Sequence, residues 1–339
     1  MILENLFLQN FRNFKDFSLQ IDQRKQLHIF GLNGTGKTNL LEAIYILFTS
    51  RSFRNRKSLR DCVKTGEPYF HLQADINAQR SGMTFSINDM EKSFMLQQER
   101  VKSLEFVRGK NILYFSPDET QIFFQSQEIR RALLDRYLSA LRKPYLQKLL
   151  NFSTLRQKKL QILLSKTTRK RSLLDLDSQA FRVISNEISD DRGWFIDRLN
   201  PLFQEYLERL NPKLKNSQMK YRKRQIPDNY LEKELAQERI LYGCHKEELD
   251  FLEHGKDVRS TFSNGEKKVV NLALHFSFME LLRQEAGLQC LICLDDIESE
   301  LDSNTLQNIQ EVLDQSESQV IVTSKMIHRA SDRDILLTT

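Results

Sequence analysis

Cysteine is scarce in this sequence, and hydrophobic runs are short. The 339 residues include four cysteines, which form no disulfide framework. Charged or polar residues interrupt every apolar stretch well before it reaches the length needed to span a bilayer. The first seven residues alternate like a strand and lack the basic start and small-residue cleavage site of a signal peptide. We therefore expect a cytoplasmic protein without a membrane-spanning segment.

Metal-binding and repeat patterns are also missing. Cys290 and Cys293 have the spacing of a zinc-binding pair, but no second pair exists, so we expect them to pack inside a buried strand. The chain contains no internal repeat and no low-complexity tract. With 40% hydrophobic and 28% charged residues, it has the composition and length of a soluble protein with one large domain and a substantial insertion.

Positive charge is present and is clustered. The net charge is only +6, but three segments contain basic residues and no acid: five in 51–60, ten in 142–171 and six in 213–224. Such clusters are typical of proteins that bind a polyanion, because neutralising its phosphates releases counterions. The alternative interpretation is a set of solvated helix faces.

A complete phosphate-binding loop lies between an apolar strand and a helix. The segment runs Gly-Leu-Asn-Gly-Thr-Gly-Lys-Thr from Gly31 to Thr38, in the context that the motif requires. Its backbone N–H groups and the helix N-terminus favour a bound phosphate. We expect Lys37 to contact the β- and γ-phosphates of ATP and Thr38 to ligate Mg²⁺. The expected nucleotide-binding residues are Gly31, Asn33, Gly34, Thr35, Gly36, Lys37, Thr38 and Asn39.

A second group of chemically capable residues follows the apolar segment 291–294. The carboxylates of Asp295 and Asp296 come directly after it, as in a strand that ends beside a bound magnesium ion. We expect Asp295 to hold Mg²⁺ through water, and Asp296 to orient or deprotonate the attacking water. A helix N-cap pair is the alternative for these two residues taken alone.

The hydrophobic pattern predicts an α/β protein with a helical insertion. Strands are expected over 6–13, 19–22 and 26–30, an antiparallel sheet over 69–113, and further strands near 219–222, 289–294 and 319–323. Residues Ser116 to Asp118 are expected to begin a long helical region that ends at Leu210, before Asn211 and Pro212. Helices are also expected after the phosphate loop, over 269–283 and over 304–313.

A third motif resembles the signature of the ABC ATPases. Ser263, Asn264, Gly265 and Glu266 open an apolar helix about thirty residues before Asp295, where that family has Leu-Ser-Gly-Gly-Gln. Residues 299–302 resemble the family's D-loop. The resemblance implies that Ser263 and the N–H groups near Gly265 act on ATP held by a second copy of the chain, so that ATP joins two subunits.

The spacing and further segments resemble the SMC-like branch, and within it the RecF family of bacterial DNA replication and repair proteins. Ser263 follows Lys37 by 226 positions, about twice the separation in transporter subunits. Family-like segments are 8–14, 36–45, 50–54, 113–118 with Arg130, Arg131 and 134–136, then 198–201, 243–245 and 294–302. Asp296 matches the RecF family, which has Asp where other ABC ATPases have Glu.

Some positions depart from the RecF pattern. Gly34 and Thr35 replace the usual Ala-Gln, Ser263 to Glu266 replace Ser-Gln-Gly-Gln, and residues 243–248 replace Gly-Pro-His-Arg-Asp-Asp. Glu266 would bring an acid near the γ-phosphate and slow turnover or weaken ATP-driven pairing. His245, in the last segment, is either a structural or a functional histidine.

The resemblance implies an ABC-type ATPase head, formed by residues 1–120 and 213–339, with a helical arm over 121–212. It implies a slow, DNA-stimulated ATPase that dimerises with ATP on double-stranded DNA, at gaps and single-strand/double-strand junctions, and helps RecO and RecR load RecA. The predicted DNA contacts are backbone-directed and independent of base sequence. They are Arg51, Arg54, Arg56, Lys57, Lys158, Lys159, Arg169 and Lys170.

Three alternatives remain open. A transporter ATPase would have a switch histidine after the strand near 320, where this chain has Thr323 and Ser324, with His328 a few residues late. An overcoming-lysogenization nuclease carries a further metal-dependent domain, for which we expect no room after the last strand. The third alternative is an ATP-dependent DNA clamp of the same SMC-like group that hydrolyses ATP negligibly, because Asp296 is a shorter base than Glu and Glu266 replaces Gln.

Overall fold

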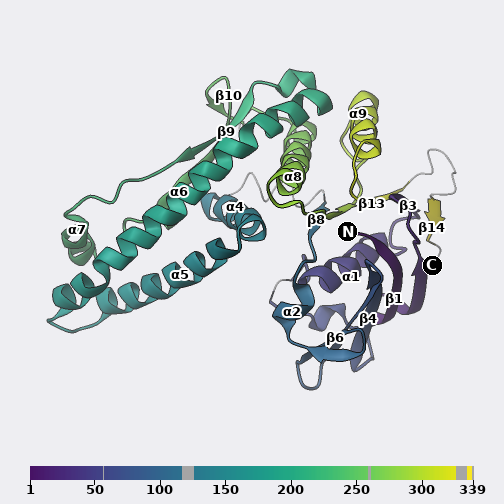
Figure 1. Ribbon diagram of the computed structural model, residues 1–339, viewed down its shortest axis with the longest axis horizontal. Coiled ribbons are helices and arrows are strands. Elements are labelled where there is room, and N and C mark those ends of the chain that lie inside the picture. Colours follow the sequence, from purple (N-terminus) through teal and green to yellow (C-terminus); the bar gives the residue numbers. More distant parts are fainter. Residues whose placement is uncertain (56, 117–125, 259–260, 326–333, 338–339) are drawn as a thin grey trace. The chain divides into compact units, whose positions relative to one another are not determined.

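The chain folds into two compact units. The computed structural model describes residues 1–55, 57–116, 126–258, 261–325 and 334–337 (Figure 1). The first unit comprises Met1–Pro117 and Gly287–Thr339, and the second comprises Asp118–Ala286. In the described part of the chain, no helix has both the length and the apolar character needed to cross a membrane.

An antiparallel sheet of six strands forms one layer of the first unit. Its order is β2-β1-β4-β5-β6-β7. Along β4, every second side chain is buried, which is the two-residue period of a sheet with one face on the core. The strands are β1 (Leu3–Phe11), β2 (Phe14–Gln20), β4 (Tyr69–Ile76), β5 (Gln79–Ser86), β6 (Lys92–Leu96) and β7 (Glu99–Val101).

A parallel sheet of five strands forms the second layer of this unit, in the order β14-β3-β13-β12-β8. Every residue of β12 and β13 is buried, as is usual for parallel strands covered on both faces. Cys293 lies in β12 and is buried, as is Cys290 just before that strand. The strands are β3 (Gln26–Phe30), β8 (Ile112–Phe115), β12 (Leu291–Leu294), β13 (Val320–Ser324) and β14 (Asp334–Leu336).

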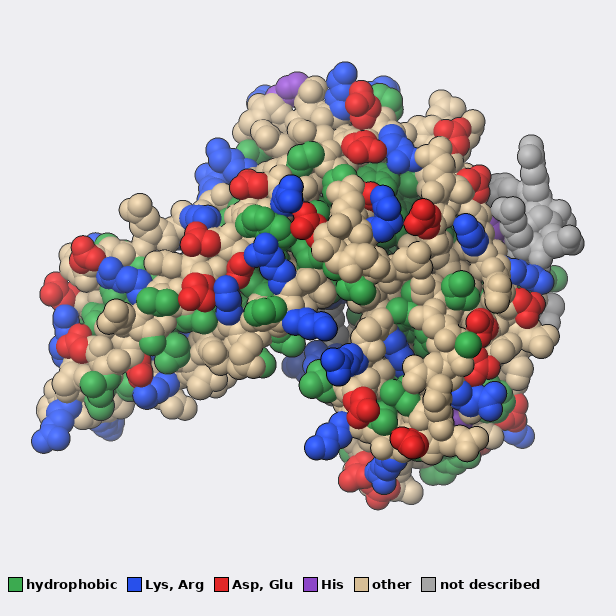
Figure 2. Space-filling view, viewed as in Figure 1, with side chains coloured by type: hydrophobic (Ala, Val, Ile, Leu, Met, Phe, Trp, Pro, Cys, Tyr) green, Lys and Arg blue, Asp and Glu red, His purple; other side chains and the backbone are tan. Residues whose placement is uncertain are grey.

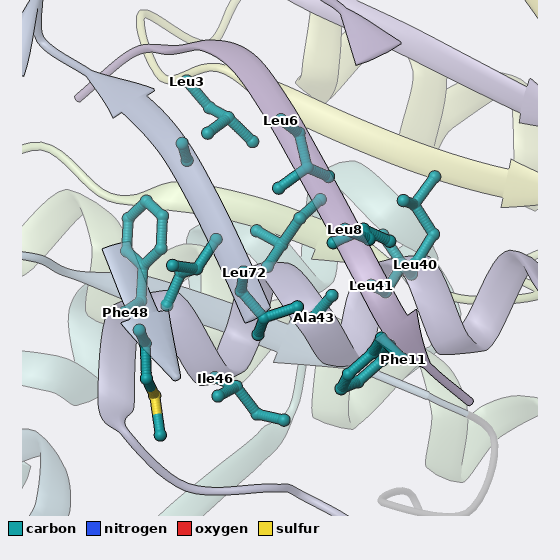
Figure 3. Packing of buried hydrophobic residues seen from close by; sticks show 14 of the residues in the cluster. Leu3, Leu6, Leu8, Phe11, Leu40, Leu41, Ala43, Ile46, Phe48 and Leu72 are labelled. Atoms are coloured by element: carbon teal, nitrogen blue, oxygen red, sulfur yellow. The ribbon is translucent and has the colours of Figure 1, made fainter. Parts of the chain in front are cut away.

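Helix α1 (Lys37–Thr49) packs against strands of both sheets, namely β1, β4 and β5 of the antiparallel sheet and β8 of the parallel one. A helix enclosed in this way is apolar on more than one face, which explains its seven buried apolar side chains. Figure 3 shows how side chains of α1 and β1 pack together in this core. Shorter helices of the first unit are η1 (Arg60–Cys62), α2 (Ser103–Val107) and α9 (Ser303–Asp314).

The second unit is a helical arm with a small sheet at its base. Helices α5 (Lys143–Leu164) and α6 (Lys170–Leu210) form an antiparallel hairpin, and α4 (Gln127–Leu141) and α8 (Asn264–Ala286) pack against α6 (Figure 1). The sheet has the order β11-β10-β9, with β9 (Ser217–Arg222), β10 (Glu248–Glu253) and β11 (Lys256–Asp257). The remaining helices are η2 (Pro212–Leu214), α7 (Tyr230–Gln237) and η3 (Cys244–Lys246).

The α/β class and most predicted elements are confirmed. The predicted domain boundary between residues 212 and 213, however, lies inside the second unit. Residues 213–286 belong with the arm, because β9 and α8 both pack on α6. The first unit's N-terminal segment ends at Pro117, close to the predicted boundary at residue 120. The predicted start of the helical region, Ser116–Asp118, lies partly outside the described residues, because 117–125 are not described. The first described helix after this gap is α4, with Ser126 as its N-cap.

Candidate nucleotide site

The phosphate loop and the acidic pair meet at one edge of the parallel sheet. The loop follows β3, Asp295 and Asp296 follow β12, and β13 lies between these two strands and ends with Thr323 and Ser324. Because all three strands are parallel, their carboxyl ends lie at the same edge, which is where α/β proteins bind ligands. Two sequence motifs more than 250 positions apart are thereby brought together.

Glycine is required at two positions of the loop by close packing. Gly36 has a φ of 104°, and a Cβ there would lie 2.7 Å from the Asn13 amide nitrogen. That amide donates to the Thr35 carbonyl (3.2 Å), and its oxygen accepts from Asn39 (2.8 Å). A Cβ at Gly31 would lie 2.6 Å from the Thr35 hydroxyl. A side chain at either glycine would therefore displace groups that support the loop.

The N-terminus of α1 fits an anionic phosphate group. The N-cap residue is Gly36, no side chain caps the helix, and no acid lies in its first turn. The partial positive charge of the helix end is therefore available to a ligand. Thr38 and Asn39 lie half-buried in that turn, and Asn33 and Gly34 are exposed on the loop.

Lys37 extends over the loop. Its ammonium donates to the carbonyls of Gly31 (2.5 Å) and Leu32 (3.0 Å). Burial lowers the pKa of Lys37, against the opposing effect of the carboxylates of Asp295 and Asp296. The two acceptors that the structure gives this ammonium are neutral carbonyls, and a phosphate oxygen is a stronger acceptor, so the residues present fit the polyphosphate of ATP.

Asp295 is a buried carboxylate with two hydrogen-bond donors. Its Oδ1 accepts from the Thr323 hydroxyl (2.5 Å), and its Oδ2 accepts from the Tyr114 hydroxyl (3.3 Å). Within the described ranges, no group of three or more His, Cys, Asp or Glu side chains is placed to hold a metal ion. A buried carboxylate and a hydroxyl are oxygen ligands of the type that Mg²⁺ takes together with phosphate and water, so Asp295 and Thr38 would fit this ion.

Asp296 has a left-handed backbone conformation, with a φ of 45°. Its N–H donates to the Thr323 hydroxyl (3.2 Å), and its Oδ2 lies 3.4 Å from the Lys325 ammonium. Thr323 thus contacts both members of the acidic pair. Sequence reasoning noted Thr323 only because it is not a histidine. Thr323 could have been recognised from its position near the end of β13, the strand between the one that precedes the phosphate loop and the one that precedes the acidic pair.

The segment after the acidic pair turns sharply into α9. Ser299 donates its hydroxyl to the Asp296 carbonyl (3.1 Å), and Glu300 has a φ of 66°. Asp302 caps α9 by accepting from the Thr305 N–H (2.9 Å), which lowers the pKa of Asp302. The predicted D-loop is therefore an ordered turn that ends in a helix N-cap.

The signature motif begins α8 in the second unit as a capping box. The Ser263 hydroxyl accepts from the Glu266 N–H (3.3 Å), and the Glu266 carboxylate accepts from the Ser263 N–H (2.8 Å) and hydroxyl (2.9 Å). Gly265 lies in the first turn. The carboxylate that the sequence places near a γ-phosphate is thus turned back onto its own helix end.

Comparisons with known proteins identify the family. A family model described as the RecF/RecN/SMC N terminal domain matches residues 2–336. The chain belongs to this family. The DNA replication and repair protein RecF of Lachnospira eligens is 30% identical over 325 residues, which are 90% of this chain and 87% of that protein.

Solved structures of RecF and Smc proteins share the fold. The structure of the recombination mediator protein RecF with ATP, in the RecFOR pathway, has a TM-score of 0.80 at 24% identity and covers 97% of this chain and 93% of that one. The Smc head bound to the C-terminal winged-helix domain of ScpA has a TM-score of 0.58 at 17% identity, covering 96% and 89%. The predicted ABC-type head with an inserted helical arm is confirmed.

Two arginines, one of them in the basic segment 51–60, bind side chains of helix α1, which follows the phosphate loop. Glu42 is fully buried and forms ion pairs with Arg12 (2.9 Å) and Arg54 (3.0 Å). Arg54 also donates to Asn39 (2.7 Å), in the first turn of α1. Arg54, predicted to contact DNA, thus has structural partners beside the nucleotide site. Arg51 and Lys57 are exposed, and Arg56 lies outside the described residues.

The arm residues predicted to contact DNA have different environments. Lys159 is a wrong prediction, because its side chain is 5% exposed and its ammonium lies 2.6 Å from the buried Glu234 carboxylate. Lys158 pairs with Asp177 (2.6 Å), Lys170 pairs with Glu238 (2.6 Å), and Arg169 is exposed. On the face of the arm in Figure 2, Lys and Arg alternate with Asp and Glu rather than forming one basic stripe.

Proposed function

We propose that the chain is an ATP-dependent DNA-binding protein of recombinational repair and replication-fork maintenance. The observation that carries the proposal is the meeting of the phosphate loop with Asp295 and Asp296 at one sheet edge. Relatives named DNA replication and repair protein RecF support the cellular role, and with it a cytoplasmic location.

The proposed chemistry is a slow hydrolysis of ATP. Lys37 binds the β- and γ-phosphates, and the N–H groups of the loop and the first turn of α1 hold the phosphate chain. Thr38, and Asp295 through water, would hold Mg²⁺, which would neutralise charge on the phosphates. Asp296 orients a water molecule for in-line attack and accepts its proton. Thr323 fixes the Asp295 carboxylate and the Asp296 backbone through the hydrogen bonds described above.

The proposed working form is an ATP-dependent homodimer on double-stranded DNA, at gaps and single-strand/double-strand junctions. Ser263 and Gly265 of one copy close over the γ-phosphate bound by the other copy. RecR and RecO are the proposed protein partners, and loading of RecA is the proposed outcome. Support comes from the resemblance of residues 263–266 and 299–302 to the signature and the D-loop, and from the RecFOR structure with the same fold.

The proposed DNA contacts are backbone-directed. Arg51, Lys57 and Arg169 are exposed cations, while Lys158 and Lys170 would exchange a carboxylate partner for a phosphate. Such contacts weaken with salt, because each neutralised phosphate releases counterions. Fluorescence anisotropy with a labelled gapped duplex tests this. With ATP we expect binding to fall steeply between 50 and 200 mM salt, about a thousandfold for six contacts. Binding that is insensitive to salt and ATP would contradict the proposal.

A clamp with negligible hydrolysis is the second candidate. One observation favours it: Lys325 lies beside the carboxylate of Asp296, the proposed base. Turnover measured with and without duplex DNA distinguishes the two functions. DNA-stimulated phosphate release supports the ATPase. ATP-dependent DNA binding without release supports the clamp.

A further inference from the structure

The second unit contains a cavity of about 550 Å³, formed without any residue of the phosphate loop or the acidic pair. This volume is within the usual range for small-molecule sites. Helices α4, α5, α6 and η3 line it, together with residues next to β9 and β10. Its charged and imidazole side chains are Glu128, Arg131, Asp135, Arg156, Arg192, Arg224, His245, Lys246 and Glu248.

A saturated ion pair forms the rigid base of this cavity. Arg192 is 3% exposed and binds the Asp135 carboxylate through two parallel hydrogen bonds, both of 2.8 Å. Its remaining donor group binds the Cys244 carbonyl (2.7 Å). The Tyr145 hydroxyl donates to Asp135 (2.6 Å). These groups satisfy one another, so they hold the shape of the cavity and leave binding to other residues.

The remaining charges of the cavity are mostly positive. Glu248 is bound by Arg224, as Asp135 is by Arg192. Three cations, Arg131, Arg156 and Lys246, then face one carboxylate, Glu128. Arg131 is anchored to the Glu247 carbonyl (2.5 Å), whereas Arg156 and Lys246 have no ion-pair partner among the described residues. Surplus cations that converge on a concave surface favour an anion.

His245 adds an unused hydrogen-bonding group. Both of its ring nitrogens are buried and have no hydrogen-bond partner among the described residues. Burial lowers its pKa to about 3, and the positive charges of Arg156, Lys246 and Arg131 act in the same direction. The neutral ring has one N–H donor. A buried polar group without a partner needs an explanation, and a ligand that the cations attract supplies one.

An apolar wall lies beside these polar groups. Leu149, Ala132 and the buried Phe152 line the same cavity, and the Phe152 ring centroid is 5.8 Å from that of His245. An aromatic and aliphatic surface next to a group of cations matches a ligand with a flat apolar part and an anionic part. A nucleotide has both.

We propose that this cavity binds a nucleoside phosphate, at a site separate from the phosphate loop. Arg131, Arg156, Lys246 and the His245 N–H hold the phosphate, and the apolar wall contacts the base. The proposal does not depend on the proposed ATPase. Two sources supply this chemistry, a free nucleotide or a nucleotide within a DNA strand.

Calorimetric titration of the full chain tests the proposal. All variants carry Lys37→Met, which weakens nucleotide binding at the phosphate loop. The probes are 2′-deoxyadenosine 5′-monophosphate, which represents a free nucleotide, and the dinucleotide d(ApA), which represents a DNA strand. Arg156→Gln with Lys246→Gln should raise the Kd of the bound probe at least about tenfold, the effect of losing charged hydrogen bonds. The control is Lys213→Gln with Lys215→Gln, which removes two exposed charges of the same unit and should leave the Kd unchanged.

His245→Phe separates binding from folding. The imidazole makes no hydrogen bond within the part of the chain that the structure describes, so Phe should leave Tm unchanged or higher, while the Kd rises about tenfold. Binding of the monophosphate alone identifies a free nucleotide as the source, and tighter binding of d(ApA) identifies a strand. The proposal is overturned if neither probe binds, if an acidic peptide binds more tightly than both, or if pocket and control variants bind equally.

Discussion

The hydroxyl of Ser263 has two competing acceptors. In the free chain it donates to the Glu266 carboxylate (2.9 Å), whereas the proposed dimer needs it for a phosphate oxygen. A carboxylate is a strong acceptor, and it also repels the phosphate. In the proposed dimer, the residue that replaces the family's glutamine would therefore oppose ATP-driven pairing.

Glu266→Gln should strengthen this pairing. The amide oxygen can still accept from the Ser263 N–H, so the helix cap is retained while the negative charge is removed. We expect a gain of about 1 kcal/mol, or about fivefold, in ATP-dependent dimerisation. Sedimentation at increasing ATP concentration measures it, with the exposed Glu205→Gln as the control. Weaker pairing in Glu266→Gln would show that the carboxylate assists closure.

His245 should make the protein sensitive to acid. Its pKa is about 3 in the folded chain, against an ordinary value of 6.5. Above pH 6.5 the ring is neutral in both states, so it has no effect. As the pH falls from 6.5 towards 3, only the unfolded chain binds the proton, and stability falls by at most about 1.4 kcal/mol per pH unit. The carboxylates of Glu128, Asp135 and Glu248 line the same cavity.

Denaturant unfolding at several pH values isolates the contribution of His245. The His245→Phe variant removes this titration, so its stability should fall less steeply than that of the wild type between pH 6.5 and pH 5. Parallel pH curves for the two proteins would mean that the imidazole is accessible to protons in the folded state.

The sequence identifies site residues where local context defines them. A strand, a glycine-rich loop and a helix place Gly31 to Thr38 without any knowledge of the rest of the chain. The roles of Thr323 and Lys159 depend instead on distant partners. Thr323 contacts Asp295 because β13 lies between β3 and β12, and Lys159 contacts Glu234 across the arm. The spacing of residues along the chain does not predict such contacts.

At the scale of elements, the arm is held by a buried ion pair between α5 and α7. Lys159 and Glu234 are 5% and 0% exposed, and the ammonium also lies over the rings of Phe181 and Tyr230 at 4.1 and 4.3 Å. Removing Lys159 leaves the buried Glu234 carboxylate without its ion-pair partner, although the N–H groups of Leu241 and Tyr242 still donate to it. The basic block 142–171 therefore includes a residue that stabilises the arm.

Adjacent lysines allow a matched test. Lys159→Met should lower the free energy of unfolding by about 3 to 5 kcal/mol. Lys158→Gln removes an exposed pair with Asp177 and should cost about 1 kcal/mol or less, while weakening DNA binding if Lys158 contacts phosphate. Urea unfolding of both variants gives the two values. Equal losses would mean that the Lys159 pair is not buried in solution.

Periodicity predicts the elements better than their grouping. The pattern near Met219 predicts a strand, and the resemblance placed this strand in the head. In the structure this strand pairs with β10 and packs on α6, so it belongs to the arm. Local pattern cannot tell which of two sheets a strand joins, since that choice depends on contacts between distant segments.

At the scale of the whole molecule, the proposed chemistry is divided between two units. The phosphate loop and the acidic pair belong to the first unit, and the signature belongs to the second. In the proposed mechanism, a second copy supplies the signature to each ATP. ATP then acts as a shared ligand of the dimer, and its binding energy favours the paired state by mass action.

Sedimentation of the wild type and Lys37→Met, with and without ATP, Mg²⁺ and a gapped duplex, tests this central claim most directly. The account predicts wild-type monomers that pair only with ATP and bind the duplex more tightly when paired, while Lys37→Met stays monomeric. A wild type that ignores ATP, with both proteins binding DNA equally, would contradict it.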